Sequence, residues 1–178
     1  MRKDVVVLNG GSSAGKSTIA RSLQALLSEP WLTLGVDDLI DALGPAGPES
    51  NSVITFSPDG VVSTSEVFRD VENAWNHGLA AIARSGTGVI IDDVFLGGAV
   101  SQSRLSSALS NLKVLWVGVH CDPDIASLRE LSRPNRVIGM ARTQSSIVHE
   151  GVNYDIEVDT SDTSALECAH VILRSMNL

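Results

Sequence analysis

A glycine-rich run at residues 10–17, Gly-Gly-Ser-Ser-Ala-Gly-Lys-Ser, lies between an apolar stretch at 5–8 and a helix-like stretch at 19–27. Its order fits the pattern G-x-x-x-x-G-K-[ST] in the strand–loop–helix context that the pattern requires. Glycines let such a loop curl so that backbone N–H groups point inward at phosphate oxygens, and the N-terminus of the next helix adds a positive dipole potential. The run therefore predicts a strand, a phosphate-binding loop and a helix, in that order.

Two other interpretations of this run fit less well. A glycine-rich turn that only caps a helix explains the glycines but not the Gly15-Lys16-Ser17 ending. A dinucleotide-binding turn would need a G-x-G at the start of the loop, and none is there. We therefore expect Lys16 to reach the β- and γ-phosphates of a nucleotide and the Ser17 hydroxyl to coordinate Mg²⁺. The nucleotide contacts are predicted to come from Gly10, Gly11, Ser12, Ser13, Ala14, Gly15, Lys16, Ser17 and Thr18.

Length, charge and composition favour one soluble domain spanning residues 1–178. A net charge of −8 argues against a nucleic-acid-binding surface, which needs clustered Lys and Arg. No apolar run approaches the ~20 residues that span a bilayer, so no membrane association is expected. The N-terminus leads directly into the strand before the loop, which argues against a signal peptide and favours a cytoplasmic protein. Cys121 and Cys168 lack metal-type spacing and are expected to be reduced thiols.

Apolar runs alternate with helix-like stretches along the chain. Strands are predicted at 5–8, 32–36, 89–91, 114–119 and 154–158, and helices at 19–27, 68–82, 99–109 and 165–176, with Ser63 and Glu66 suiting a capping box before the second helix. Such alternation predicts an α/β fold, a parallel sheet with helices on both faces. Ligands bind such sheets at the carboxyl ends of the strands, where Gly10, Asp37 and Asp92 fall.

Two segments interrupt the alternation. Residues 44–64 form an insertion that is predicted to contain a hairpin at 53–64 and to wall a substrate site. Residues 128–142 carry several arginines and are predicted to form a lid, because Pro134 interrupts helix there. Arg133 and Arg136 could stabilise the negative charge of a transferring phosphoryl group, or could belong to a solvated cationic helix face.

Two carboxylates at strand ends are candidates for chemistry. Asp92 ends an apolar strand, where it could hold Mg²⁺ or contact a substrate, while Asp93 suits a turn. Asp37 ends the second strand, where a carboxylate can accept the proton of an attacking hydroxyl. The alternative is that a carboxylate here caps a helix beginning at Leu39, a role that Asp38 also fits.

Aromatic and imidazole side chains are less informative. Trp75 and Phe95 can be core residues or can line an aromatic substrate pocket. The four histidines show no paired metal spacing and are expected to be structural.

The chain also resembles the chloramphenicol phosphotransferase family of small phosphate-loop kinases. The resemblance rests on Leu8-Asn9-Gly10 through Ser17, Glu29-Pro30-Trp31, Gly35-Val36-Asp37, Ile90 through Gly98, Leu115 through Val119, Val148-His149-Glu150-Gly151-Val152 and Tyr154-Asp155. It implies the fold of nucleoside monophosphate and shikimate kinases, with a five-stranded parallel sheet. It further implies ATP and Mg²⁺ as cofactors and the primary 3-hydroxyl of chloramphenicol as acceptor, which would confer antibiotic resistance.

The resemblance also implies roles for single residues. Asp37 would be the general base, Lys16 the clamp on the γ-phosphate, Ser17 a Mg²⁺ ligand, and Arg133 and Arg136 part of a closing lid. The implied substrate pocket would contain Ser12, Asp37, Trp75, Asp92 and Phe95, with Asp92 also a candidate metal residue.

Other functions stay open at this point. A kinase of the same fold could act on another small alcohol metabolite, and a nucleotide-binding regulatory module is a third candidate. Against that module, the sequence has no Asn-Lys-x-Asp motif and no D-x-x-G after Asp92. The sequence does not distinguish ATP from GTP and is compatible with a homo-oligomer.

Overall fold

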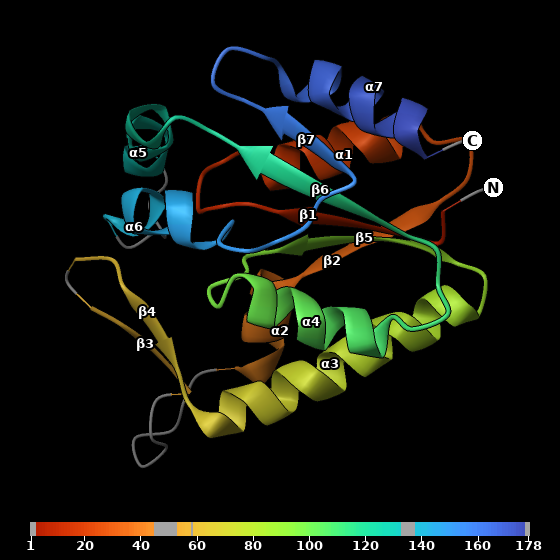
Figure 1. Ribbon diagram of the computed structural model, residues 1–178, viewed down its shortest axis with the longest axis horizontal. Helices are drawn as coiled ribbons and strands as arrows, with labels where there is room; N and C mark the ends of the chain where they lie inside the picture. The colour runs from red at the N-terminus through yellow and green to blue at the C-terminus, as the bar shows by residue number, and fades with distance from the viewer. Residues whose placement is uncertain (1–2, 45–52, 58, 133–137, 177–178) are drawn as a thin grey trace.

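The computed structural model describes residues 3–44, 53–57, 59–132 and 138–176. Its centre is a five-stranded sheet in the order β2-β5-β1-β6-β7 (Figure 1). Every neighbouring pair in this sheet is parallel. The strands are β1 (Val5–Asn9), β2 (Trp31–Gly35), β5 (Gly88–Asp93), β6 (Val114–His120) and β7 (Ile156–Asp159). The predicted five-stranded parallel sheet is confirmed.

Strand β1 is the middle of the sheet and is buried along its whole length. Its side chains alternate between two cores. Val6 and Leu8 belong to a cluster with helix residues such as Ile19, whereas Val5 and Val7 belong to a second cluster with residues such as Leu79. A strand covered on both faces has no solvated side, which is why residues 5–8 are continuously apolar.

Four long helices cover the two faces (Figure 1). α1 (Lys16–Leu26) and α7 (Ala165–Ser175) pack together on one face, and α3 (Glu66–Arg84) and α4 (Ala99–Ala108) cover the other. The predicted cap of α3 was wrong by two residues. Ser63 lies in a strand, and the N-cap is Ser65, whose hydroxyl accepts a hydrogen bond from the backbone N–H of Phe68 at 3.2 Å.

Shorter elements gather at the carboxyl edge of the sheet. They are α2 (Val36–Leu43), the antiparallel hairpin of β3 (Ile54–Phe56) and β4 (Val62–Thr64), α5 (Pro123–Leu131) and α6 (Met140–Ile147). The hairpin matches the prediction for 53–64. Its tip contacts α6, because the Thr143 hydroxyl donates to the Gly60 carbonyl at 3.2 Å. These two elements enclose the space beyond the strand ends.

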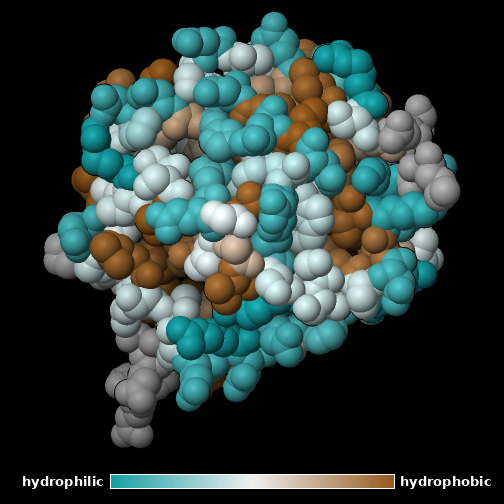
Figure 2. All heavy atoms as spheres, viewed as in Figure 1, coloured by the Kyte–Doolittle hydropathy of each residue, from teal (hydrophilic) through white to brown (hydrophobic). Residues whose placement is uncertain are grey.

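The face of the molecule seen in Figure 2 mixes hydrophilic and hydrophobic residues. Within the described ranges, no helix combines the length and the apolar composition that crossing a membrane requires.

Candidate active site

The glycine-rich run forms the predicted loop between β1 and α1. Gly15 has φ +89° at the N-cap of α1, and Ser13 has φ +59°. Gly10 allows a close approach, since a Cβ there would lie 2.4 Å from the Val119 carbonyl oxygen. The loop therefore curls tightly over the end of the sheet and leads into a helix N-terminus, which is the arrangement that binds phosphate.

The Lys16 side chain reaches back to the start of the phosphate loop. Its Nζ donates hydrogen bonds to the carbonyl oxygens of Gly10 at 2.9 Å and Gly11 at 3.0 Å, and lies 3.8 Å from the Asp92 carboxylate. The residue is buried, with 7% of its surface exposed. A buried ammonium group inside a phosphate-binding loop can exchange these carbonyl oxygens for phosphate oxygens.

Ser17 and Asp92 form the second contact of the site. The Ser17 hydroxyl donates to Asp92 Oδ2 at 2.6 Å, joining α1 to the end of β5. Both side chains supply hard oxygen donors, and Mg²⁺ prefers a few such ligands completed by water and phosphate. Among the residues that the structure describes, no group of three or more His, Cys, Asp or Glu side chains could hold a metal ion. The oxygen atoms of the Ser17–Asp92 pair are of the kind that binds Mg²⁺.

Asp93 turns away from this pair. Its carboxylate accepts a hydrogen bond from the Val94 backbone N–H at 2.7 Å, and the residue is the last of strand β5 rather than the turn residue that the sequence suggests. Burial raises the pKa of Asp93 to about 6, and the charges of Glu72 and Asp92 add to the rise.

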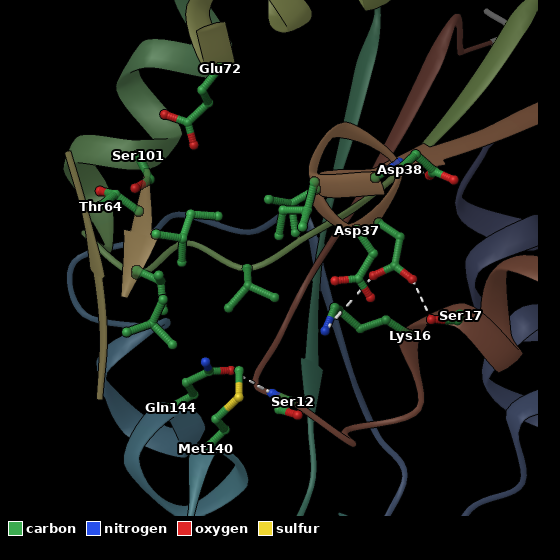
Figure 3. Close-up of a pocket in the computed structure, with 18 of the residues that line it drawn as sticks. Ser12, Lys16, Ser17, Asp37, Asp38, Thr64, Glu72, Ser101, Met140 and Gln144 are labelled. Atoms are coloured by element: carbon green, nitrogen blue, oxygen red, sulfur yellow. Dashed lines mark hydrogen bonds and ion pairs between the residues drawn. The ribbon is translucent and has the colours of Figure 1, made fainter. Parts of the chain in front are cut away.

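Asp37 and Asp38 have different roles in α2. The helix begins at Val36 rather than Leu39, so Asp38 is its third residue and not its N-cap. The Asp38 carboxylate accepts a hydrogen bond from the Gly35 backbone N–H at 2.7 Å and so caps the helix from within. Asp37 instead points into the same space as Lys16 (Figure 3). Asp38 therefore caps the helix, and Asp37 lines the cavity beside the phosphate loop.

These groups open into a cavity of about 980 Å³. One end holds the phosphate loop, and residues of α2, α3, α4, α6, the hairpin and the ends of β2 and β5 also line it. The wall combines apolar side chains with charged ones; the apolar ones include Ile40, Ile54, Val62, Val94, Leu96, Val100 and Met140. Glu72 lies across the cavity from Lys16 and Asp37 (Figure 3). The cavity therefore has room for a second molecule beside a nucleotide.

Gln144 of α6 is a site residue that the sequence did not reveal. Its Oε1 accepts a hydrogen bond from the Ser12 backbone N–H at 2.8 Å, and its side chain is buried in the cavity wall. The hydroxyl oxygens of Ser12 and Ser13 are also buried and have no hydrogen-bond partner. Buried hydroxyls without partners are costly, so these two favour a bound polar ligand at the loop.

Asn9 directly precedes the phosphate loop and links it to distant segments through hydrogen bonds. Its Nδ2 donates to the Val148 carbonyl at 2.8 Å and to the Tyr154 hydroxyl at 2.6 Å, and its Oδ1 accepts from the Phe95 backbone N–H at 2.9 Å. The Tyr154 hydroxyl therefore donates its own proton to His149 Nδ1, 2.6 Å away. Burial, and then the nearby His120, lower the pKa of His149 to about 4, which matches a neutral acceptor.

Two predicted pocket residues lie elsewhere. Phe95 is 1% exposed and belongs to the core beneath α3 and α4, and Trp75 packs against that same core. Neither side chain lines the cavity, and both pack with the hydrophobic cluster between the sheet and α3 and α4. The predicted lid residues Arg133 and Arg136 lie outside the described residues.

Known proteins are similar to this chain in sequence and in fold. A family model described as chloramphenicol phosphotransferase-like protein matches residues 3–177. Relatives from two strains of Mycobacterium tuberculosis, each named "Putative O-phosphotransferase", are 30% identical over 96% of this chain and 81% of their own length.

Solved structures agree on the fold. A sugar kinase from Janibacter sp. has a TM-score of 0.71 at 16% identity, covering 97% of this chain and 94% of its own. The APS kinase CysC of Mycobacterium tuberculosis, in complex with AMPPNP and APS, has a TM-score of 0.65 at 15% identity, covering 99% of both chains. Shikimate kinase from Acinetobacter baumannii, in complex with shikimate, has a TM-score of 0.61 at 19% identity, covering 97% and 92%. The implied kinase fold is therefore confirmed.

Proposed function

Because the chain belongs to the chloramphenicol phosphotransferase-like family, we propose that it is an ATP-dependent O-phosphotransferase. Its proposed acceptor is the primary 3-hydroxyl of chloramphenicol or of a closely related antibiotic, so that the product confers resistance. One observation carries the proposal: Lys16, Ser17, Asp92 and Asp37 open into one cavity that continues well beyond the phosphate loop. A regulatory nucleotide-binding module has no need for that second space.

The donor half of the mechanism uses the loop. Backbone N–H groups of residues 10–18 bind the phosphates of ATP, and Lys16 turns from the carbonyls of Gly10 and Gly11 to the β- and γ-phosphates. Ser17 and Asp92 would hold Mg²⁺, which supplies neutralisation of the phosphate charge when bound. Arg133 and Arg136 are proposed to approach the transferring group from residues 128–142.

The acceptor half uses Asp37. Its carboxylate accepts the proton of the acceptor hydroxyl while that oxygen forms a bond to the γ-phosphorus. The bond between the γ-phosphorus and the bridging oxygen breaks, and ADP leaves with that oxygen. Holding the hydroxyl in line with this bond provides most of the acceleration that such a site offers.

The setting of the protein follows from the same requirements. ATP is a cytoplasmic substrate, and Cys121 and Cys168 are free thiols in the structure. Both features support a cytoplasmic enzyme whose partner is a small alcohol.

A product assay tests this function. Purified protein is incubated with ATP, Mg²⁺ and chloramphenicol, and the products are analysed by mass spectrometry. We expect chloramphenicol carrying one added phosphoryl group at its primary hydroxyl, together with ADP. Turnover of a different alcohol without any product from chloramphenicol would overturn the proposed acceptor, and nucleotide binding without transfer to any alcohol would overturn the enzyme.

A further inference from the structure

A charged pair stands in the cavity wall opposite the phosphate loop. Glu72 of α3 and Arg104 of α4 both line the cavity, and their Oε2 and Nη2 atoms lie 3.3 Å apart. Their side chains are 23% and 43% exposed, so the pair is neither on the open surface nor sealed in the core. Figure 3 shows Glu72 separated from Lys16 and Asp37 by the width of the cavity. The mechanism of phosphoryl transfer leaves this pair without a role.

Neighbouring guanidinium groups stabilise the charged form of the Glu72 carboxylate. Burial raises the pKa of the Glu72 carboxyl, and the charges of Arg104 and Arg69 oppose that rise. Arg104 also donates a hydrogen bond to the Ser101 hydroxyl at 3.3 Å, which places its guanidinium against the same wall. Separating Arg104 from Glu72 would therefore leave a half-buried carboxylate with less compensation.

Because Arg104 compensates the charge of Glu72, the pair discriminates between charged and neutral acceptors. A carboxylate on the acceptor that binds Arg104 would lie beside the negative charge of Glu72, and the two carboxylates would repel each other. A neutral amide or hydroxyl has both a donor and an acceptor, so it can bond to Glu72 and to Arg104 without separating them. The pair thus favours a neutral polar group.

Apolar side chains line the cavity that contains both the pair and Asp37. Val94 and Leu96, between β5 and α4, and Val100 of α4 are among them. An acceptor that reaches from Asp37 to Glu72 can pack an apolar body against these side chains.

Resting on the proposed phosphotransferase function, we propose that the Glu72–Arg104 pair binds the end of the acceptor remote from the reacting hydroxyl. It selects neutral alcohols that bear an amide or a second hydroxyl over alcohols that bear a carboxylate. Glu72 is the residue that sets this selectivity.

Two alcohols that differ only at the remote end test the proposal. 4-(2-Hydroxyethyl)benzamide and 4-(2-hydroxyethyl)benzoate share a primary hydroxyl and an apolar ring, and phosphorylation of each is measured with ATP and Mg²⁺. We expect the wild-type protein to prefer the amide by about tenfold or more in kcat/KM. Glu72→Gln should lower this preference by about tenfold, chiefly by raising kcat/KM for the benzoate, because Arg104 is then free to bind it.

Arg84→Gln is the matched control. Arg84 also joins α3 to the end of α4, through hydrogen bonds to the carbonyls of Ala108 at 2.8 Å and Ser110 at 3.2 Å, but it does not line the cavity. If the Glu72–Arg104 pair only ties the two helices together, both variants would leave the amide-to-benzoate ratio unchanged.

The outcomes separate the two proposals. Three results would overturn the inference about Glu72 while the phosphotransferase function stands. They are an unchanged amide-to-benzoate ratio in Glu72→Gln, a wild-type preference for the benzoate, and turnover of chloramphenicol without turnover of either probe. Failure to phosphorylate chloramphenicol or either probe, with ATP bound, would overturn the proposed function itself.

Discussion

Asn9 connects the phosphate loop to residues far along the chain. It precedes Gly10 directly, and its amide contacts the Val148 carbonyl, the Tyr154 hydroxyl and the Phe95 amide. The Val148 carbonyl can only accept a hydrogen bond and the Phe95 N–H can only donate one. The Asn9 amide can therefore take only one of its two flipped orientations. The neutral His149 that accepts the Tyr154 proton belongs to this partly buried network, and it makes the network sensitive to pH.

The lowered pKa of His149 predicts a loss of stability in acid. The folded value is about 4 against an ordinary value of 6.5, so the unfolded chain binds the proton more readily between these values. The free energy of unfolding should therefore fall as the pH drops from about 6.5 to about 4, by roughly 1–2 kcal/mol once solvent screening is allowed for. His149→Asn keeps an oxygen acceptor for Tyr154 but cannot titrate, so its stability should fall less over this range.

Chemical denaturation at several pH values measures this difference. His170→Asn, at an exposed position on α7, serves as the control. Parallel stability curves for the wild-type protein and His149→Asn would show that His149 does not titrate in the network.

At the scale of elements, the hairpin and α6 contact each other and both contribute to the cavity wall. Their contact is tight: Gly60 has φ +82°, and a Cβ there would lie 2.4 Å from the Gly139 carbonyl carbon. The N-terminus of α6 is fixed in turn by the buried Glu130 carboxylate, which accepts hydrogen bonds from the amides of Gly139 and Ala141, both at 2.8 Å. Displacing the hairpin tip should therefore change the acceptor end of the cavity and spare the phosphate loop.

Gly60→Ala tests this contact. The added methyl group must move the tip away from α6, and we expect the KM for the acceptor to rise by about tenfold, since small displacements of a bound reactant are costly. The KM for ATP should stay within about twofold, because the loop depends on other contacts.

Gly86→Ala is the control for backbone strain. Gly86 has φ +96°, but a Cβ there meets open space, so it carries the strain without the collision. A similar rise in acceptor KM for both alanine variants, or no rise in Gly60→Ala, would contradict the role given to the hairpin.

For the whole molecule, the sheet could be predicted because each strand is a short apolar run bounded by polar residues. The loop could be predicted because its determinants are consecutive, and Asp37 and Asp92 could be found because they lie at or next to the carboxyl ends of strands. The strand boundaries differ from the predicted ones by at most two residues, and α1 begins three residues earlier than predicted. The last strand begins at Ile156 rather than Tyr154, whose ring instead packs against Gly118.

The rest of the site depends on contacts between distant segments. Gln144 meets Ser12 across 132 positions and belongs to no local pattern, so only the folded chain reveals it. Trp75 and Phe95 were assigned to the substrate pocket, but an apolar pattern predicts only that an aromatic ring is shielded from water, not whether it faces a core or a cavity. Glu72 and Arg104 are ordinary helix residues until the cavity brings them opposite the loop.

The central claim is that one molecule binds ATP at the loop and activates an alcohol at Asp37. Comparing turnover at saturating ATP between the wild-type protein and Asp37→Asn tests it most directly, with ATP affinity measured on the same samples. Asp41→Asn, an exposed aspartate on the same helix, is the control. We predict that Asp37→Asn lowers kcat by ~10²–10⁴-fold with ATP affinity nearly unchanged, the loss expected for a general base. Wild-type turnover in Asp37→Asn would contradict the account.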